Sequence, residues 1–235
     1  MVNIKEQALA YLSKDYLGNI DMIEPIRTDQ VELIYVDDQT VFLKEKRSGV
    51  YMINAEDLTQ ANKVVLLAED IQSIRTNLKQ QLDFLQEKFN LNELFLCKQC
   101  VYQNKKPLPL ETKLDIKALD LSYFDIISAN YDLITKEDLK THLKNQDLFG
   151  GFIDDQLVGF IGTHLEGSIG LLYVFNKYRK RGYASDLEAF MINHQLANNL
   201  VPFAQVKLNN FGSFAVQRKL KMTIVDKTIC WAYNT

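Results

Sequence analysis

Cysteine, proline and tryptophan are scarce in this chain of 235 residues, with three, four and one copies respectively. Three cysteines are too few for a disulfide scaffold in a chain of this length, so a reduced, cytoplasmic setting is expected. The net charge of −3 excludes the basic excess that a general nucleic-acid binder carries. No segment approaches the roughly 18 consecutive apolar residues of a membrane-spanning helix, and the first residues lack the apolar core of a secretory signal. These absences predict a protein that works without nucleic acid or membrane.

Glycine is also scarce, and its ten copies are distributed unevenly, with only two in the first 149 residues. Glycine allows the backbone to turn tightly or to approach a ligand closely, so the second half is expected to hold the tighter loops. Residues 104–110 contain two prolines, which block a helix and disfavour a central strand. We therefore place a domain boundary near Pro107, which gives one domain in residues 1–106 and a second in residues 107–235.

Both halves have the alternating apolar patterns of mixed α/β domains. In the first half the patterns predict strands at 22–27 and 31–34, a hairpin of 40–44 and 49–53, a helix at 70–90 and a strand at 94–102. In the second half they predict a strand at 114–118, helices at 122–129 and 136–144, a hairpin of 148–153 and 156–164, a strand at 168–175, a helix at 182–196, a strand at 203–208, a helix at 211–220, and a closing pair of strands at 222–225 and 229–233.

A short basic loop joins the strand at 168–175 to the following helix, which begins near Gly182. The first turn of a helix has unpaired backbone N–H groups and a partial positive charge, and together they form an anion site. Gly182 has no Cβ to keep a phosphate away from the backbone. Arg179, Lys180 and Arg181 add three positive charges, which oppose the helix dipole unless an anion lies among them. The loop therefore predicts a phosphate or diphosphate ligand, and the alternative is a solvated basic loop that happens to precede a helix.

This segment resembles a motif of the GNAT superfamily of N-acetyltransferases. Arg179, Gly182 and Ala184 match the family's Arg/Gln-x-x-Gly-x-Gly/Ala pattern. Residues 174–179 resemble the Val-x-Pro-x-Tyr-Arg approach to that pattern, with asparagine in place of the proline. Further along, residues 210–213 and 219–222 resemble the family's Asn-x-x-Ser/Ala and Lys-Leu-Gly-Phe elements.

The resemblance implies a mixed, mostly antiparallel sheet flanked by helices in residues 107–235. The preceding α/β domain would shape the acceptor site, and it is either unrelated or a degenerate copy of the same fold. The implied co-substrate is acetyl-CoA, whose pyrophosphate would bind the backbone N–H groups of residues 181–185 and whose pantetheine arm would pair with a splayed strand. The residues expected to bind it are Leu172, Tyr173, Val174, Arg179, Lys180, Arg181, Gly182, Tyr183, Ala184, Ser185, Asn210, Ser213 and Lys219.

The catalytic groups are less evident from the sequence. Glu166 is a candidate general base for the acceptor amine, and the alternative, which the sequence favours, is a turn residue beside a glycine. Tyr173 could line the site or pack in the core, and nearby His164 is interpreted as a strand residue rather than a catalyst. The family often has a tyrosine that protonates the leaving thiolate, and Gln217 occupies that position here. The usual acid is therefore missing or comes from elsewhere.

The predicted activity is transfer of an acetyl group directly to a primary amine of a small molecule or peptide, as an N-acetyltransferase. The backbone N–H of Val174 would donate to the developing oxyanion. The alternative is a non-catalytic acyl-CoA-binding or regulatory module, because Gln217 removes the expected acid, and a structural domain would require the basic loop to be a coincidence. The acceptor would be selected by residues 122–144 and the first domain. The oligomeric state stays open, with a homodimer as one alternative.

The cysteines do not change this interpretation. Cys97 and Cys100 have the spacing of zinc ligands, but no second cysteine or histidine pair accompanies them. We therefore interpret both as strand residues and predict no metal site. Cys230 has no histidine motif nearby, so it is expected to pack in the core rather than to carry an acetyl group.

Overall fold

The first half of the chain consists of paired helices followed by a strand meander and an alternation of helices and strands. The computed structural model describes residues 3–131 and 134–234, so two positions of the 122–144 stretch lie outside the described residues. The elements of the first half are α1 (Ile4–Leu12), α2 (Ile20–Arg27), β1 (Val31–Val36), β2 (Thr40–Glu45), β3 (Tyr51–Ala55), α3 (Leu58–Val64), β4 (Ser73–Thr76), α4 (Leu82–Phe89) and β5 (Glu93–Val101).

The second half repeats this order and adds one strand in front of it. Its elements are β6 (Asp115–Ala118), α5 (Phe124–Ser128), α6 (Lys136–Asn145), β7 (Leu148–Ile153), β8 (Gln156–Thr163), β9 (Ile169–Val174), α7 (Tyr183–Ala197), β10 (Phe203–Lys207), α8 (Phe211–Lys219) and β11 (Thr223–Tyr233). Short 3-10 helices are η1 (Ser13–Asp15), η2 (Val65–Leu67), η3 (Lys79–Gln81), η4 (Leu121–Tyr123) and η5 (Asn176–Tyr178). No helix among the described residues is long and apolar enough to cross a membrane.

Three of the local predictions are wrong. Residues 22–27 belong to helix α2, which is buried on nearly all sides, and the period of so short a buried segment does not distinguish a strand from a helix. Residues 70–90 contain strand β4 before helix α4, because the chain around Ile74 pairs with β3. The expected closing pair is a single strand, β11. The residues expected to form its turn instead form a bulge opposite β5, and the chain does not reverse there.

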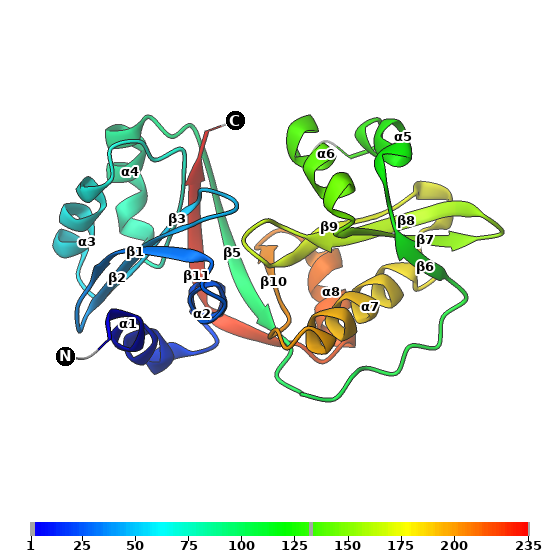
Figure 1. The fold of residues 1–235 in the computed structure, drawn as a ribbon, viewed down its shortest axis with the longest axis horizontal. Helices are drawn as coiled ribbons and strands as arrows, with labels where there is room; N and C mark the ends of the chain where they lie inside the picture. The colour runs from blue at the N-terminus through cyan, green and yellow to red at the C-terminus, as the bar shows by residue number, and fades with distance from the viewer. Residues whose placement is uncertain (1–2, 132–133, 235) are drawn as a thin grey trace.

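All eleven strands of the described chain form one mixed, mostly antiparallel sheet in the order β1-β2-β3-β4-β11-β5-β10-β9-β8-β7-β6 (Figure 1). The two parallel pairs are β3 with β4 and β9 with β10. The last strand of each half has crossed into the other half: β11 lies between β4 and β5, and β5 lies between β11 and β10. Trp231 of β11 is accordingly paired with Arg75 of β4 on one side and with Phe95 of β5 on the other. The halves therefore exchange their last strands.

The helices cover both faces of this sheet and divide the core into clusters. Helices α1 and α2 pack on one face of the first half, and α3 with α4 pack on the other. In the second half, α5 and α6 cover one face and α7 with α8 cover the opposite one. Cys97 and Cys100 of β5 point to opposite faces, the first toward α1 and α2 and the second toward α7 and α8.

Polar contacts join the halves beside the shared strands. The guanidinium of Arg27 donates to the carbonyl of Asn199 at 2.6 Å, and Glu24 accepts from the backbone N–H of Val201 at 3.0 Å. The segment from 102 to 114 between β5 and β6 contains no helix or strand. The boundary near Pro107 lies in this segment, and we keep it as a proposal.

Candidate functional site

The loop between β9 and α7 presents a row of backbone N–H groups. Lys180 has φ of +60° and Gly182 has φ of +91°, and no side chain caps the helix that follows. The N–H groups of residues 180–184 have no acceptor among the described residues, whereas the N–H of Ser185 donates to the Gly182 carbonyl at 2.9 Å. The free donors are therefore one residue earlier in the chain than expected, and successive donors of this kind form an anion-binding nest. A Cβ at Gly182 would meet nothing within 4 Å, so the site is open to a ligand.

The basic side chains of this loop are fixed by backbone carbonyls rather than by carboxylates. Nε of Arg179 donates to the carbonyl of Val174 at 2.9 Å, and Arg181 donates to the carbonyl of Lys177 at 3.3 Å. None of the loop cations at 177, 179, 180 and 181 forms an ion pair within the described chain. Four uncompensated positive charges beside a helix start suit a ligand with more than one negative charge.

Strands β9 and β10 separate directly after their first contact. Their one described pair is Ile169 with Ala204, at the beginning of both strands. Beyond it, β9 has a bulge at Leu171, where φ is +51° and the register against β8 shifts. A bulge increases local twist and bends the strand. The result is a gap between β9 and β10 that opens toward the α7 loop.

The free edge of β9 carries backbone groups that face this gap. The N–H of Phe175 donates to Val158 of β8 at 3.0 Å. Since donors alternate along an antiparallel strand, the N–H of Val174 points away from β8, toward the gap. The structure thus brings Leu172, Tyr173 and Val174 together with residues 179–184 along one continuous edge. An extended, hydrogen-bonding ligand arm with an anionic group at its far end fits this edge.

The predicted contacts on α8 are divided between its two ends. Asn210 caps the helix, since its Oδ1 accepts from the N–H of Ser213 at 3.0 Å. An asparagine or serine at such a position is a common helix-start signal, so this element has a structural role that the sequence analysis missed. Both residues lie at the carboxyl end of β10, beside the gap, whereas Lys219 lies in the last turn. The structure does not bring Lys219 to the loop of residues 179–184.

Glu166 lies in the turn before β9, beyond the closed end of the gap. Its Oε1 accepts from Oγ of Ser168 at 2.6 Å. It lines a cavity of about 290 Å³ between the two halves, together with two further carboxylates, Glu24 and Glu45. The Ile169–Ala204 pair separates this carboxylate from the open edge of β9. The geometry favours a turn role for Glu166.

His164 lies directly after β8, beside the bulge of β9. A Cβ at Gly170 would lie only 2.3 Å from Nε2 of His164, so the imidazole rests directly on the glycine one residue before Leu171. Neither ring nitrogen has a hydrogen-bond partner within the described chain. Ile169 packs toward α7 and α8, so Gly170 faces α5 and α6. From the sequence His164 is interpreted as a strand residue, and the glycine at position 170 is the feature that leaves room for its imidazole beside the bulge.

Tyr173 is part of an aromatic group on the face that α5 and α6 cover. Its ring is stacked on Phe160 at 5.6 Å and meets Phe175 edge-on at 5.3 Å. The guanidinium of Arg179 lies 5.4 Å from the ring centre. Tyr173 therefore contacts the basic loop through Arg179, and its ring lines the site on the face that α5 and α6 cover.

Gln217, at the position of the expected acid, is buried between α7 and α8. Its amide donates to Oε1 of Glu188, and both side chains are almost completely inaccessible. Burial raises the pKa of the Glu188 carboxyl to about 7, against the lowering effect of the Gln217 hydrogen bond. Neither residue lies on the free edge of β9, so they do not replace the missing acid.

The cysteines form no reactive or metal-binding group. Burial raises the pKa of the Cys97 and Cys100 thiols, the second to about 12, so both stay protonated. The described residues contain no cluster of histidine, cysteine and carboxylate ligands that could hold a metal ion.

Comparisons with known proteins bear on the family of the second half and on the fold of the chain. Residues 115–221 match the model of the acetyltransferase (GNAT) family, whereas no curated protein matches the sequence. A solved Drosophila structure is 14% identical, with 98% of this chain and 95% of that chain covered and a TM-score of 0.68. A GCN5-related N-acetyltransferase-like protein from Streptococcus suis is 14% identical, with 99% and 100% covered and a TM-score of 0.60. A tandem GNAT protein from the clavulanic acid biosynthesis pathway is 11% identical, with 97% and 93% covered and a TM-score of 0.50. At these identities the likeness shows the fold alone.

Proposed function

Because the second half of the chain belongs to the acetyltransferase (GNAT) family, we propose that the protein is an acetyl-CoA-dependent N-acetyltransferase. It would transfer an acetyl group directly to a primary amine of a small molecule or peptide, and so act as an acyltransferase that transfers groups other than amino-acyl groups. The observation that carries the proposal is the continuous edge from Leu172 to Ala184. That edge combines the side of β9 that has no partner beyond Ile169 with five N–H groups and four cations that are unpaired within the described residues.

The edge fits the two parts of acetyl-CoA that the chain must hold. The N–H groups of residues 180–184 and the side chains of Lys180 and Arg181 bind the pyrophosphate. The unpaired backbone of Leu172 binds the pantetheine arm in the manner of an added strand, and the N–H of Val174 stays available for the thioester end. Asn210 and Ser213 flank the arm from α8, on the opposite side of the gap.

The chemistry requires a neutral amine and a donor for the oxyanion. Acetyl-CoA supplies an activated thioester, and the amine nitrogen forms the new C–N bond as the C–S bond breaks. An aliphatic amine is mostly protonated at neutral pH, so a positioned base is useful. His164 takes that role, because its imidazole lies beside the bulge and neither ring nitrogen has a partner in the part of the chain that the structure describes. The N–H of Val174 donates to the developing oxyanion.

The leaving thiolate receives its proton from solvent in this scheme. Gln217 is buried against Glu188 and cannot reach the gap. A thiol has a pKa near 8.5, so its anion leaves without a dedicated acid. The missing tyrosine therefore limits the rate and does not prevent the reaction.

The first half would shape the acceptor side of the site, together with residues 122–144. Its strand β5 lies between β11 and β10 of the second half, and this contact supports the role. The protein works as a monomer or a homodimer in this proposal, since each chain carries a complete edge.

The second candidate function is a non-catalytic acyl-CoA sensor, which the buried Gln217 favours. A thiol-release assay with acetyl-CoA and a panel of primary amines separates the two. An enzyme releases free CoA in proportion to an acceptor amine. A sensor binds acetyl-CoA but releases no thiol above the uncatalysed rate with any amine, and that result would overturn the catalytic proposal.

A further inference from the structure

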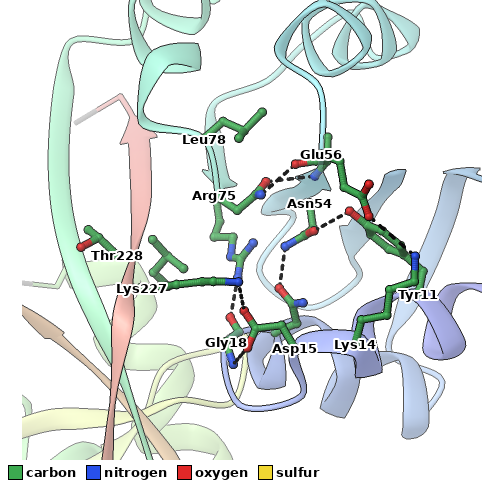
Figure 2. A pocket seen from close by; sticks show the side chains of 14 residues that line it. Tyr11, Lys14, Asp15, Gly18, Asn54, Glu56, Arg75, Leu78, Lys227 and Thr228 are labelled. Atoms are coloured by element: carbon green, nitrogen blue, oxygen red, sulfur yellow. Dashed lines mark hydrogen bonds and ion pairs between the residues drawn. The ribbon is translucent and has the colours of Figure 1, made fainter. Parts of the chain in front are cut away.

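A second polar cavity lies in the first half, away from the edge of β9. It has a volume of about 580 Å³ and lies at the carboxyl ends of β3 and β4, where the turn between α1 and α2 and strand β11 enclose it (Figure 2). Cavities of this size hold small organic ligands. Most of the residues that line it are of polar or charged types, in contrast to the apolar clusters around it.

Arg75 forms the floor of this cavity and is completely buried. Its guanidinium donates twice to Asp21, at 2.8 and 3.1 Å, and once each to the carbonyls of Gly18 and Ile53. A guanidinium has five N–H groups, so one N–H on Nη1 has no acceptor within the described chain. A buried donor without an acceptor is costly unless a ligand or water satisfies it.

Two amides beside Arg75 also have donors to spare. Nδ2 of Asn54 donates to Asn19 at 2.6 Å, while its Oδ1 accepts from the hydroxyl of Tyr11 at 2.9 Å (Figure 2). Nδ2 of Asn77 donates to the carbonyl of Ala55. Each amide nitrogen has two hydrogens and uses one of them here. The Oδ1 atoms of both amides already accept hydrogen bonds. The floor of the cavity therefore offers more unused donors than unused acceptors.

The rim adds two flexible cations on opposite sides of the opening. Nζ of Lys14 lies 3.6 Å from Glu56, and Nζ of Lys227 lies 2.7 Å from Asp15. The two lysine side chains are 62% and 76% exposed, so both can move to a ligand. Surface ion pairs of this kind contribute little stability, and a bound anion can replace them at small cost.

From these donors we infer that the cavity binds a small organic carboxylate, at a site separate from the edge of β9. The carboxylate oxygens would accept from the free N–H groups of Arg75, Asn54 and Asn77. Lys14 and Lys227 would close over the anion from the rim. Asp21 neutralises Arg75, and Glu56 and Asp15 pair with the two lysines. The attraction for an anion therefore arises only when the lysines turn from these partners to the ligand.

The cavity is not a second acetyl-CoA site. Strands β3 and β4 keep three pairs, Tyr51 with Ile74 to Ile53 with Thr76, and do not separate as β9 and β10 do. Helix α3, which corresponds to α7, is capped by the carboxylate of Asp57 on the N–H of Gln60. That carboxylate occupies the helix start and repels a pyrophosphate.

The test uses three probes of the same chain length on the full protein. Succinate has two carboxylates, 4-aminobutyrate has one, and 1,4-diaminobutane has none. Calorimetric titration is expected to give millimolar or tighter binding for the first two and none for the diamine. Failure of both carboxylates to bind at about 10 mM, or equal binding of the diamine, would overturn the inference.

Rim variants locate the binding without disturbing the floor. Lys14→Met with Lys227→Met is expected to weaken succinate binding about tenfold or more, because Glu56 and Asp15 then face the ligand unpaired. Lys105→Met, in the exposed segment between β5 and β6, is the matched control and should bind as wild type does. Unchanged affinity in the double variant would place the ligand elsewhere and refute the assignment. Because none of these residues contacts the β9 edge, acetyl-CoA titration of the same variants distinguishes failure of this inference from failure of the proposed function.

Discussion

The amide of Gln217 donates to Oε1 of Glu188 across the interface of α7 and α8, while Oε2 of Glu188 and Oε1 of Gln217 are buried without partners. A proton on Oε2 would satisfy both oxygens at once, since a carboxylic acid and a primary amide can pair through two hydrogen bonds. Burial raises the pKa of this carboxyl to about 7. The Glu188–Gln217 pair is therefore uncharged below about pH 7 and carries a buried negative charge above it.

Stability should consequently depend on pH through Glu188. The folded protein holds this proton up to about pH 7, whereas the carboxyl has its ordinary pKa of 4.5 in the unfolded chain and releases the proton there. The stabilisation is complete below the unfolded pKa and is lost as pH rises through the folded pKa. Glu188→Gln keeps an amide pair and removes the titration. In urea denaturation, the wild type should lose about 3 kcal/mol relative to this variant between pH 4.5 and pH 8. Parallel pH profiles would refute the protonated pair.

The side-chain amide of Asn77, directly after β4, connects β4 to the end of β3. It accepts from the N–H of Ala55 and donates to the carbonyl of the same residue, both at 2.9 Å. Asn77→Ala should leave two backbone groups of the buried Ala55 unpaired and lower the free energy of unfolding by about 1–3 kcal/mol. Asn198→Ala, at an exposed position after α7, is the control and should cost less. Acetyl-CoA affinity should be unchanged. Wild-type stability in Asn77→Ala would contradict this role.

The exchange of strands makes the halves interdependent. A fragment of residues 107–235 lacks β5, which separates β10 from β11 in the intact sheet. We expect the fragment to be unfolded or aggregated, because unpaired central strands expose backbone groups and apolar faces. Circular dichroism and limited proteolysis would show this. Recovery of a folded fragment upon addition of residues 1–106 is expected, and a fragment that is native-like alone would contradict the account.

The second half was largely predictable because its signals are local. A glycine at a helix start, cations before it and apolar alternation on β7, β8 and β9 each depend on a few neighbouring residues. The location of Glu166 and Lys219 was not predictable in this way. Their distance from the gap depends on where β9 and β10 separate and on which end of α8 faces it.

The first half shows the limits of local patterns more clearly. Met22 and Ile23 lie in a helix whose acidic residues, Asp21 and Glu24, are buried with the apolar ones, so no exposed polar face reveals its period. The exchange of β5 and β11 depends on pairing between segments more than 120 residues apart, for example Trp231 with Phe95. No pattern within either strand specifies that partner, so the sequence suggested a hairpin.

The role of His164 gives a kinetic prediction. His164→Gln should lower kcat by about 10²-fold or more, within the usual range for loss of a general base, with the KM for acetyl-CoA unchanged. The deficit should shrink at high pH, where more of the amine is neutral. His194→Gln, on the exposed side of α7, is the matched control and should retain activity. Full activity in His164→Gln at neutral pH would remove this residue from the mechanism.

The central claim is that the loop before α7 holds a pyrophosphate, and acetyl-CoA titration of Gly182→Glu tests it most directly. Gly167→Glu is the matched control, because Gly167 also has a positive φ, +99° against +91°, and open space around it, but lies at the other end of β9. Both variants carry the same backbone strain and added charge. Calorimetry should show wild-type affinity in Gly167→Glu and a loss of binding of at least about a hundredfold, or about 2.7 kcal/mol, in Gly182→Glu. Equal affinity in the two variants would show that the pyrophosphate binds elsewhere.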